Sequence, residues 1–364
     1  MGICESKNKN EMIPERKLTI TNNKKKENSN SSMGLNTTND INGHNHNNSD
    51  LCDQNSGVQN DQSNSEVKTI ITPQINYKRI NSIDAHRDII VCLIELYDRN
   101  IASCSYDKTI KIWNKDTYQC DREIITSSKV FCLLEFEPGK LLCGTENKEI
   151  ELYDLYDIKS STKPDIVFQG HLLWVNCLAK CDEHMFASGS NDTDIRIWDY
   201  SAHQQSKVLS DHSKEVLTLI QLKDGRLCSG SADLSIKIWN WKEEKCDATL
   251  IGHLRWVKCI LELSKGIIIS GSDDKTIRVW DIDKKECLDK LIDHKKSVRS
   301  LCKLSNEYIA SASFDGTIKI WDLNKKECIQ TLTEHSSKVI CLLNYSGILI
   351  SASGDKTIKL WENK

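Results

Sequence analysis

A ten-residue pattern recurs seven times between residues 105 and 362 and constrains the fold more than any other feature of the chain. The ninth residue of each copy is aromatic, and successive aromatic residues are 40, 45, 41, 41, 41 and 40 positions apart. A regular period of this length predicts a repeat architecture, because each unit can bury its apolar surface only against its neighbours. The copies are "SYDKTIKIWN" (105–114), "TENKEIELYD" (145–154), "SNDTDIRIWD" (190–199), "SADLSIKIWN" (231–240), "SDDKTIRVWD" (272–281), "SFDGTIKIWD" (313–322) and "SGDKTIKLWE" (353–362).

The residues within and between these copies favour short β-strands. In one repeat the runs "VKCILEL", "IIISGS" and "TIRVW" are rich in β-branched residues, and Gly, Asp and Lys separate them. Runs of this kind bounded by turn residues are typical of strands. Both faces of the strands look apolar, as expected for a sheet packed between two other sheets. We therefore predict an all-β fold.

Six of the seven repeats also share a His, a Ser, an Asp and a Trp at fixed offsets. The Ser follows the His by 17 positions, or by 16 in the last repeat; the Asp follows the Ser by four and the Trp follows the Asp by six. The second repeat differs, with Cys143, Asn147 and Tyr153 at the Ser, Asp and Trp positions and no matching His. The six sets are His86, Ser103, Asp107, Trp113; His171, Ser188, Asp192, Trp198; His212, Ser229, Asp233, Trp239; His253, Ser270, Asp274, Trp280; His294, Ser311, Asp315, Trp321; and His335, Ser351, Asp355, Trp361.

The period and the terminal Trp-Asp dipeptide resemble the WD40 repeat, and the resemblance covers nearly all of residues 77–364. It implies a seven-bladed β-propeller in which each blade is a four-stranded sheet. In that family the His, Ser, Asp and Trp of one blade form a buried hydrogen-bond network, so the six sets are predicted to be structural tetrads. The second repeat is predicted to be the least cooperative blade, or a blade adapted to a partner.

A Ser, a His and an Asp together also suggest a catalytic triad. We reject this interpretation because the set recurs six times, whereas catalysis requires one activated nucleophile. The chain has no glycine-rich phosphate loop, and the two His of "GHNHNN" (43–48) have no Cys or carboxylate beside them to complete a metal site. We expect no enzymatic activity, no cofactor and no metal.

Composition divides the chain into two regions. Residues 1–75 contain fifteen Asn and no Phe, Trp or Tyr, a composition that cannot bury enough apolar surface to fold. We predict a disordered tail over 1–75 and a propeller over 76–364. Because Trp361 lies only three residues before the last residue, the seventh repeat lacks its own fourth strand. Residues 76–84 are predicted to supply that strand, as the N-terminal segment does in the family.

One face of the ring is predicted to bind partners. Strands alternate in direction within a blade, so the loop before the first strand and the turn between the second and third share one face. The loops "GHLLWV" (170–175) and "GHLRWV" (252–257) are more apolar than their equivalents, and exposed aromatic residues are common interface anchors. The alternative is that their Trp residues pack on neighbouring blades. The predicted binding residues are Ile89, Tyr106, Leu172, Trp174, Leu254, Trp256 and Phe314.

The first residues, "MGICES", match the N-myristoylation pattern M-G-x-x-x-[ST], with Gly2 as the acceptor. A single myristoyl chain binds membranes only weakly, so a second signal is needed. Cys4 is the candidate palmitoylation site, and residues 24–26 form a short Lys cluster. No signal peptide precedes the repeats, and the Cys are interpreted as reduced thiols. We predict a cytoplasmic protein held at the cytosolic face of a membrane.

The family resemblance implies a non-catalytic scaffold that binds other proteins or peptides through the faces of a monomeric propeller. Two alternatives come from the same family, a substrate-recognition subunit of a ubiquitin ligase and a signalling subunit resembling the G-protein β chain. Both would need a helical segment outside the repeats, and residues 1–75 show no helical apolar period. A net charge of −3, with Lys mixed among Asp and Glu, argues against nucleic acid as a partner.

Overall fold

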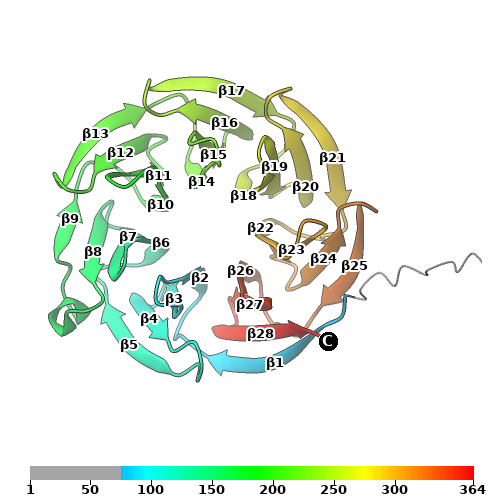
Figure 1. Cartoon of the computed structure of the whole chain (residues 1–364), viewed down its shortest axis with the longest axis horizontal. Coiled ribbons are helices and arrows are strands. Elements are labelled where there is room, and N and C mark those ends of the chain that lie inside the picture. The colour runs from blue at the N-terminus through cyan, green and yellow to red at the C-terminus, as the bar shows by residue number, and fades with distance from the viewer. Residues whose placement is uncertain (1–74) are drawn as a thin grey trace, which may run out of the picture. The chain divides into compact units, whose positions relative to one another are not determined.

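The computed structural model describes residues 75–364, apart from the side chains of residues 158 and 160. These residues form seven four-stranded antiparallel sheets, arranged as blades around a common centre (Figure 1). The seven-bladed propeller predicted from the repeats is therefore confirmed. Within the same residues the single helix is a short 3₁₀ turn, η1 (Ile158–Ser161), and no helix is long and apolar enough to cross a bilayer.

Each of six blades is built from four strands that are consecutive in sequence. The first strand lies nearest the centre of the ring and the fourth lies at its outer edge. Blades 1 to 3 consist of β2 (Ile90–Glu95), β3 (Ile101–Ser105), β4 (Thr109–Trp113), β5 (Cys120–Ile125); β6 (Val130–Glu137), β7 (Lys140–Thr145), β8 (Ile150–Asp154), β9 (Ile166–Phe168); and β10 (Val175–Lys180), β11 (Met185–Ser190), β12 (Ile195–Asp199), β13 (Gln204–Leu209). Blades 4 to 6 consist of β14 (Val216–Gln221), β15 (Leu227–Ser231), β16 (Ser235–Asn240), β17 (Lys245–Ile251); β18 (Val257–Ser264), β19 (Ile267–Ser272), β20 (Thr276–Asp281), β21 (Glu286–Ile292); and β22 (Val298–Lys303), β23 (Tyr308–Ser313), β24 (Ile318–Asp322), β25 (Glu327–Leu332).

Blade 7 combines the two ends of the described chain. Its inner strands are β26 (Val339–Tyr345), β27 (Ile348–Ser353) and β28 (Thr357–Asn363), and its outer strand is β1 (Tyr77–Asp84). The register runs from Tyr77 opposite Asn363 to Asp84 opposite Thr357. Tyr77 is buried, and both its backbone N–H and its C=O are hydrogen-bonded to the side chain of Gln330 in blade 6. The pairing covers the free edge of β28 and closes the ring (Figure 1).

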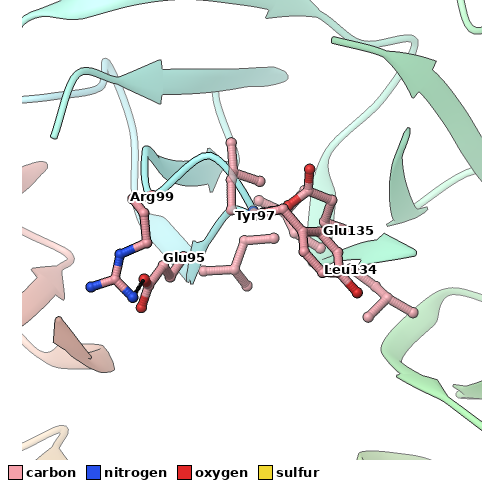
Figure 2. A pocket seen from close by; sticks show the side chains of 8 residues that line it. Glu95, Tyr97, Arg99, Leu134 and Glu135 are labelled. Carbon is pink, nitrogen blue, oxygen red and sulfur yellow. Dashed lines mark hydrogen bonds and ion pairs between the residues drawn. The ribbon is translucent and has the colours of Figure 1, made fainter. Parts of the chain in front are cut away.

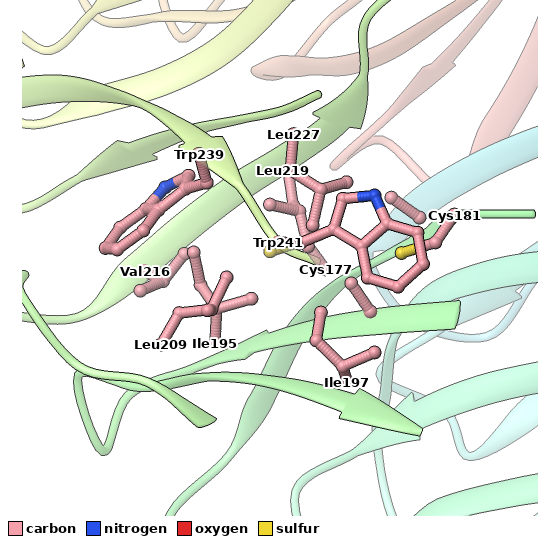
Figure 3. Packing of buried hydrophobic residues seen from close by; sticks show 12 residues of the cluster. Cys177, Cys181, Ile195, Ile197, Leu209, Val216, Leu219, Leu227, Trp239 and Trp241 are labelled. Atoms are coloured by element: carbon pink, nitrogen blue, oxygen red, sulfur yellow. The ribbon is translucent and has the colours of Figure 1, made fainter. Parts of the chain in front are cut away.

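The core lies in layers between adjacent blades. The second strand of each blade is almost wholly buried, whereas outer strands such as β5 and β13 are mostly exposed or half-buried, with one buried residue each. Figure 3 shows the layer between blades 3 and 4, where Ile195 and Ile197 of β12 face Val216 of β14 and Trp239 of β16. Since each layer takes side chains from two blades, no blade can bury its apolar surface alone.

Each of the six predicted tetrads comes together as a hydrogen-bonded chain inside its blade. The His Nε2 lies 2.6–2.7 Å from the Ser Oγ, and the His Nδ1 lies 2.7–3.0 Å from the Asp carboxylate. The Trp Nε1 donates to the same Ser Oγ at 2.7–2.9 Å. Because a carboxylate only accepts, Nδ1 carries the ring proton and Nε2 accepts from the Ser hydroxyl. The Ser side chains are fully buried and cannot act as nucleophiles on a substrate.

Burial alone would raise the pKa of the tetrad carboxyls, but hydrogen bonds from the His ring and from backbone amides outweigh it and lower the pKa. For Asp192 the pKa falls to about 2. Burial also lowers the pKa of His253, although Asp274 opposes the shift. A neutral His253 beside an ionised Asp274 agrees with the proton positions assigned above.

Blade 2 replaces the tetrad with a network around Glu151, a carboxylate that is 1% exposed. The Tyr153 hydroxyl donates to its Oε2 at 2.7 Å, and the Ser127 hydroxyl donates to its Oε1 at 2.5 Å. Cys143 lies 3.9 Å from the same carboxylate, and Asn147 donates to Ser127. The sequence contained a signal for this network, because the other six repeats carry Lys or Arg at the position of Glu151.

Deleting residues 77–84 is expected to destabilise the whole ring, because it exposes β28 and removes the buried Tyr77. We expect the melting temperature to fall by at least about 5 °C, since each kilocalorie per mole lost lowers it by about 2 °C in a domain of this size. Differential scanning calorimetry measures the change, with Lys78→Ala, an exposed position on the same strand, as the control. A deletion variant that melts like the full chain would contradict closure by β1.

The depressed pKa of the tetrad Asp residues predicts loss of stability in acid. An unfolded Asp has a pKa near 3.9, so the folded state binds fewer protons, and the free energy of unfolding is expected to decrease as the pH falls below about 4. Asp192→Asn is expected to cost about 2 kcal/mol at neutral pH and to make this decrease shallower. Urea unfolding at a series of pH values measures both effects, with the exposed Asp116→Asn as the control. An unchanged slope in Asp192→Asn would count against the assignment.

Candidate partner-binding face

The two loops predicted to share a face are joined by a backbone hydrogen bond in all seven blades. In each blade the N–H of the residue before the turn Asp (Asn147 in blade 2) donates to the C=O of the residue before the first strand, at 2.8–3.0 Å. The regular backbone places fourteen residues in equivalent positions around one end of the ring. The pairs, donor first, are Tyr106–Ile89, Glu146–Lys129, Asn191–Trp174, Ala232–Glu215, Asp273–Trp256, Phe314–Ser297 and Gly354–Lys338.

At this end of the ring lies a pocket of about 480 Å³, which we call the central pocket. Six of the seven blades contribute to it, so it exists only because the ring is closed. Its lining mixes aromatic, amide and charged side chains: Val91, Tyr106, Phe131, Trp174, Asn176, Asn191, Glu215, Leu217, Trp256, Lys258, Arg299 and Phe314.

Four of the seven predicted binding residues line the central pocket, namely Tyr106, Trp174, Trp256 and Phe314. Leu254 is 74% exposed and lines an adjoining depression with Trp256 and Leu234. Leu172, which is 68% exposed, and the half-buried Ile89 belong to the same loops but do not line the central pocket.

Trp174 both packs on a neighbouring blade and stays accessible, so the two alternatives drawn from the sequence are not exclusive. Its ring stacks on Phe131 of blade 2 with centroids 5.4 Å apart, and Phe131 meets Tyr106 of blade 1 edge-on at 5.7 Å. Trp174 and Trp256 each remain 43% exposed. The stacking holds the Trp174 ring in place, and a rigid, half-exposed aromatic ring loses little entropy when a partner covers it.

The residues that reach the central pocket from the inner strands themselves were not among the predicted binding residues. They occupy the second position of each inner strand, directly after a buried Val or Ile, and all but Ile340 line the central pocket. The "V-x-C" pattern repeated in most inner strands contained this position, but which neighbours it meets depends on the closed ring. The residues are Val91, Phe131, Asn176, Leu217, Lys258, Arg299 and Ile340.

Cationic groups lie over three of the aromatic rings. Lys258 Nζ is 4.3 Å from the Trp256 ring centroid, and Arg299 and Lys338 approach the Phe314 ring at 5.1 and 5.2 Å. Lys129 lies 5.7 Å from Tyr106 and is also paired with Glu146. These contacts make one end of the ring an aromatic surface with embedded positive charge.

A second pocket, shown in Figure 2, lies at the other end of the inner strands, where β2 ends and the loop to β3 begins. Its polar groups already have partners. Arg99 pairs with Glu95 at 2.6 Å, and Glu135 accepts the backbone N–H groups of Tyr97 and Gly139. Tyr97 is 57% exposed, so this pocket places an exposed aromatic ring, comparable to Trp174 and Trp256, on the opposite face of the ring of blades.

No group of three His, Cys, Asp or Glu side chains placed to hold a metal ion is found within residues 75–364. Burial also raises the pKa of the Cys132, Cys177 and Cys259 thiols on the inner strands. A raised pKa disfavours the thiolate, which is the form that binds metals and attacks substrates.

The seven closed blades and their repeated Ser-centred networks define the class of WD-repeat propellers. A family model described as "WD domain, G-beta repeat" matches six stretches that together make up more than half of the chain, and the chain belongs to the WD40-repeat family. The matched residues are 77–114, 162–199, 203–240, 244–281, 285–322 and 326–362. The unmatched stretch between the first two contains the Glu151 network of blade 2. Propellers of this family bind other proteins.

The chain is also similar to several other proteins, each over about a third of its length. They include the ribosome biogenesis protein WDR12 homolog of Anopheles gambiae, 28% identical over 123 residues, which is 33% of this chain and 28% of that protein. The target of rapamycin complex subunit LST8-1 of Arabidopsis thaliana is 33% identical over 104 residues, 28% of this chain and 33% of that protein. The ribosome biogenesis protein YTM1 of Meyerozyma guilliermondii is 30% identical over 117 residues, 31% of this chain and 26% of that protein. The chain thus spans about a quarter to a third of the length of these relatives.

Proposed function

We propose that this protein is a non-catalytic scaffold that binds a partner protein or peptide at the face carrying the central pocket. The observation that carries the proposal is the gathering of five aromatic side chains at one end of the ring: Tyr106, Phe131, Trp174, Trp256 and Phe314. Aromatic and Arg side chains at the centre of a concave surface are the usual anchors of protein interfaces.

The surroundings of the central pocket also support a binding role. The exposed Leu172 and Leu254 extend the apolar surface outward from Trp174 and Trp256, so a bound segment has apolar contacts beyond the central pocket itself. One of the relatives is named as a subunit of a protein complex, and a role within an assembly is consistent with this surface.

Truncating the exposed aromatic anchors tests the proposal. We expect Trp174→Ala and Trp256→Ala each to weaken partner capture, because loss of an interface anchor costs about 2 kcal/mol or more, roughly thirty-fold in affinity. Quantitative mass spectrometry of affinity-purified complexes measures recovery. Tyr97→Ala removes a similarly exposed ring from the opposite face and serves as the control. The proposal fails if both Trp variants recover the same proteins in the same amounts as the natural chain.

The identities of the recovered proteins bear on the two more specific roles. Ubiquitin-ligase components would support a substrate-recognition subunit, and G-protein γ- or α-type chains would support a signalling subunit. The monomeric state of the propeller stays a prediction until the mass of the purified chain is measured in solution.

We also propose that the protein is cytoplasmic and is held at the cytosolic face of a membrane by acylation of Gly2 and Cys4. Both residues lie outside the described part of the chain. Support comes from the M-G-x-x-x-[ST] pattern at the first residues and from Cys4 close to the acceptor. Two lipid chains are needed because one myristoyl chain gives only marginal binding.

Gly2→Ala removes the myristoyl acceptor and is expected to move the protein from the membrane fraction to the soluble fraction. Cys4→Ser is expected to leave myristoylation intact but to weaken membrane retention, since one chain remains. Metabolic labelling with alkynyl myristate and palmitate measures the two acylations, and fractionation measures membrane retention. Identical fractionation of the natural chain and Gly2→Ala would refute the anchor.

A further inference from the structure

Two of the seven inner strands place a cation at the central pocket, and the two strands are neighbours. Lys258 is the second residue of β18 and Arg299 the second residue of β22, and these strands lie side by side in blades 5 and 6. The equivalent residues of the other five inner strands are uncharged. The two cations therefore lie on one side of the central pocket, whose other lining residues are aromatic, amide or aliphatic apart from the carboxylate of Glu215.

Arg299 has no anionic partner among residues 75–364. Its Nε is buried without a hydrogen-bond acceptor, and no ion pair involves its guanidinium within that range. The guanidinium carbon of Arg299 lies over the Phe314 ring, 5.1 Å from the ring centroid. Three other arginines have a buried unpaired Nε, but Arg122, Arg196 and Arg278 each donate through another guanidinium nitrogen. A guanidinium that is partly buried without an acceptor is costly, which suggests that its acceptor comes from a ligand.

Lys258 is nearly as poorly compensated. Its side chain is 9% exposed, and its closest carboxylate is Asp273 at 3.8 Å. Asp273 also accepts a hydrogen bond from Ser297, so it is shared. Burial first, and then the nearby Arg299 charge, lower the pKa of Lys258 to about 8, while Asp273 and Glu215 oppose the shift. The two cations repel each other, and the nearby carboxylates of Asp273 and Glu215 oppose the effect of that repulsion on Lys258.

We propose that the central pocket binds an anionic side chain of the partner peptide, a carboxylate or a phosphate, between Arg299 and Lys258. The planar guanidinium suits two parallel hydrogen bonds to either group, and the ammonium supplies a point charge. Trp256 and Phe314, on which the two cations lie, flank the anion and exclude water from it. The inference rests on the proposed partner-binding face and specifies the chemistry that this face recognises.

Anion binding is expected to depend on pH. A bound anion stabilises protonated Lys258, so the affinity is expected to fall as the pH rises through about 8, where the free protein loses that proton. The other titratable groups that act on Lys258 are Arg299, Asp273, Glu215 and the Cys259 thiol, whose pKa burial raises to about 12. Burial raises the pKa of Tyr106, which also lines the central pocket and therefore stays neutral over the same range.

Small anions test the inference without knowledge of the partner. Thermal unfolding of the full chain is followed in increasing inorganic phosphate or acetate, with NaCl keeping the ionic strength constant. We expect saturable stabilisation by at least one of the two anions, because a ligand that binds only the folded state raises the melting temperature. In Arg299→Gln the half-saturation concentration is expected to rise at least about ten-fold. Arg226→Gln, a surface arginine paired with Asp224, is expected to behave like the natural chain.

The two anions distinguish the source of the charge. Stabilisation by phosphate alone supports a phosphorylated partner, and stabilisation by acetate as well supports an acidic side chain. Acetate stays ionised from about pH 7 to about pH 9, so its weaker binding at the higher pH reports Lys258. If Arg299→Gln does not fold, Lys258→Met carries the same comparison. The inference is overturned if neither anion stabilises the natural chain, or if both stabilise the variant equally well.

Failure of this inference is separable from failure of the proposed function. If Trp174→Ala and Trp256→Ala lose partners while neither anion binds, the binding face stands and the anionic ligand is refuted. If an anion binds through Arg299 while the Trp variants keep all partners, the anion site stands and the partner-binding face is refuted.

Discussion

A buried Ser hydroxyl is the interaction on which each of six blades depends. It accepts a hydrogen bond from the Trp indole and donates one to the His ring, so it joins the loop before the first strand to the second and third strands. All three groups are shielded from water, and each would lack a partner if the blade shifted. The indole also packs between blades, as Trp239 does in Figure 3. The network within a blade therefore sets the surface against which the next blade packs.

Blade 2 shows that the ring requires a satisfied polar centre rather than one particular set of residues. Glu151 receives hydroxyl donors from Tyr153 and Ser127 and takes over the bridging that a His and a Ser perform elsewhere. A buried carboxylate is tolerated because both of its oxygens accept hydrogen bonds. That this blade is the least cooperative, or is adapted to a partner, stays a prediction, and its interior is hydrogen-bonded.

The same regular backbone leaves the binding chemistry to positions that the fold does not constrain. Seven equivalent loop pairs and seven equivalent inner-strand positions point toward one end of the ring, and their side chains differ from blade to blade. Two neighbouring cations persist there because aromatic faces partly compensate them and because no packing role excludes them. Membership of the WD40 family thus explains the frame, whereas the proposed binding chemistry comes from side chains that differ from one repeat to the next.

The sequence by itself determined the ring. The seven copies of its repeat predicted seven blades, and the fixed offsets between His, Ser, Asp and Trp predicted the tetrads. It also identified Trp174 and Trp256, because their loops are more apolar than the equivalent loops of the other repeats. Only the tertiary structure revealed the stacking of Phe131 on Trp174. It also revealed that Lys258 and Arg299, which has no anionic partner among the described residues, lie on neighbouring inner strands. The reason is geometric. These residues lie about one repeat apart in the chain, and they meet only when closure brings neighbouring inner strands together around a shared centre.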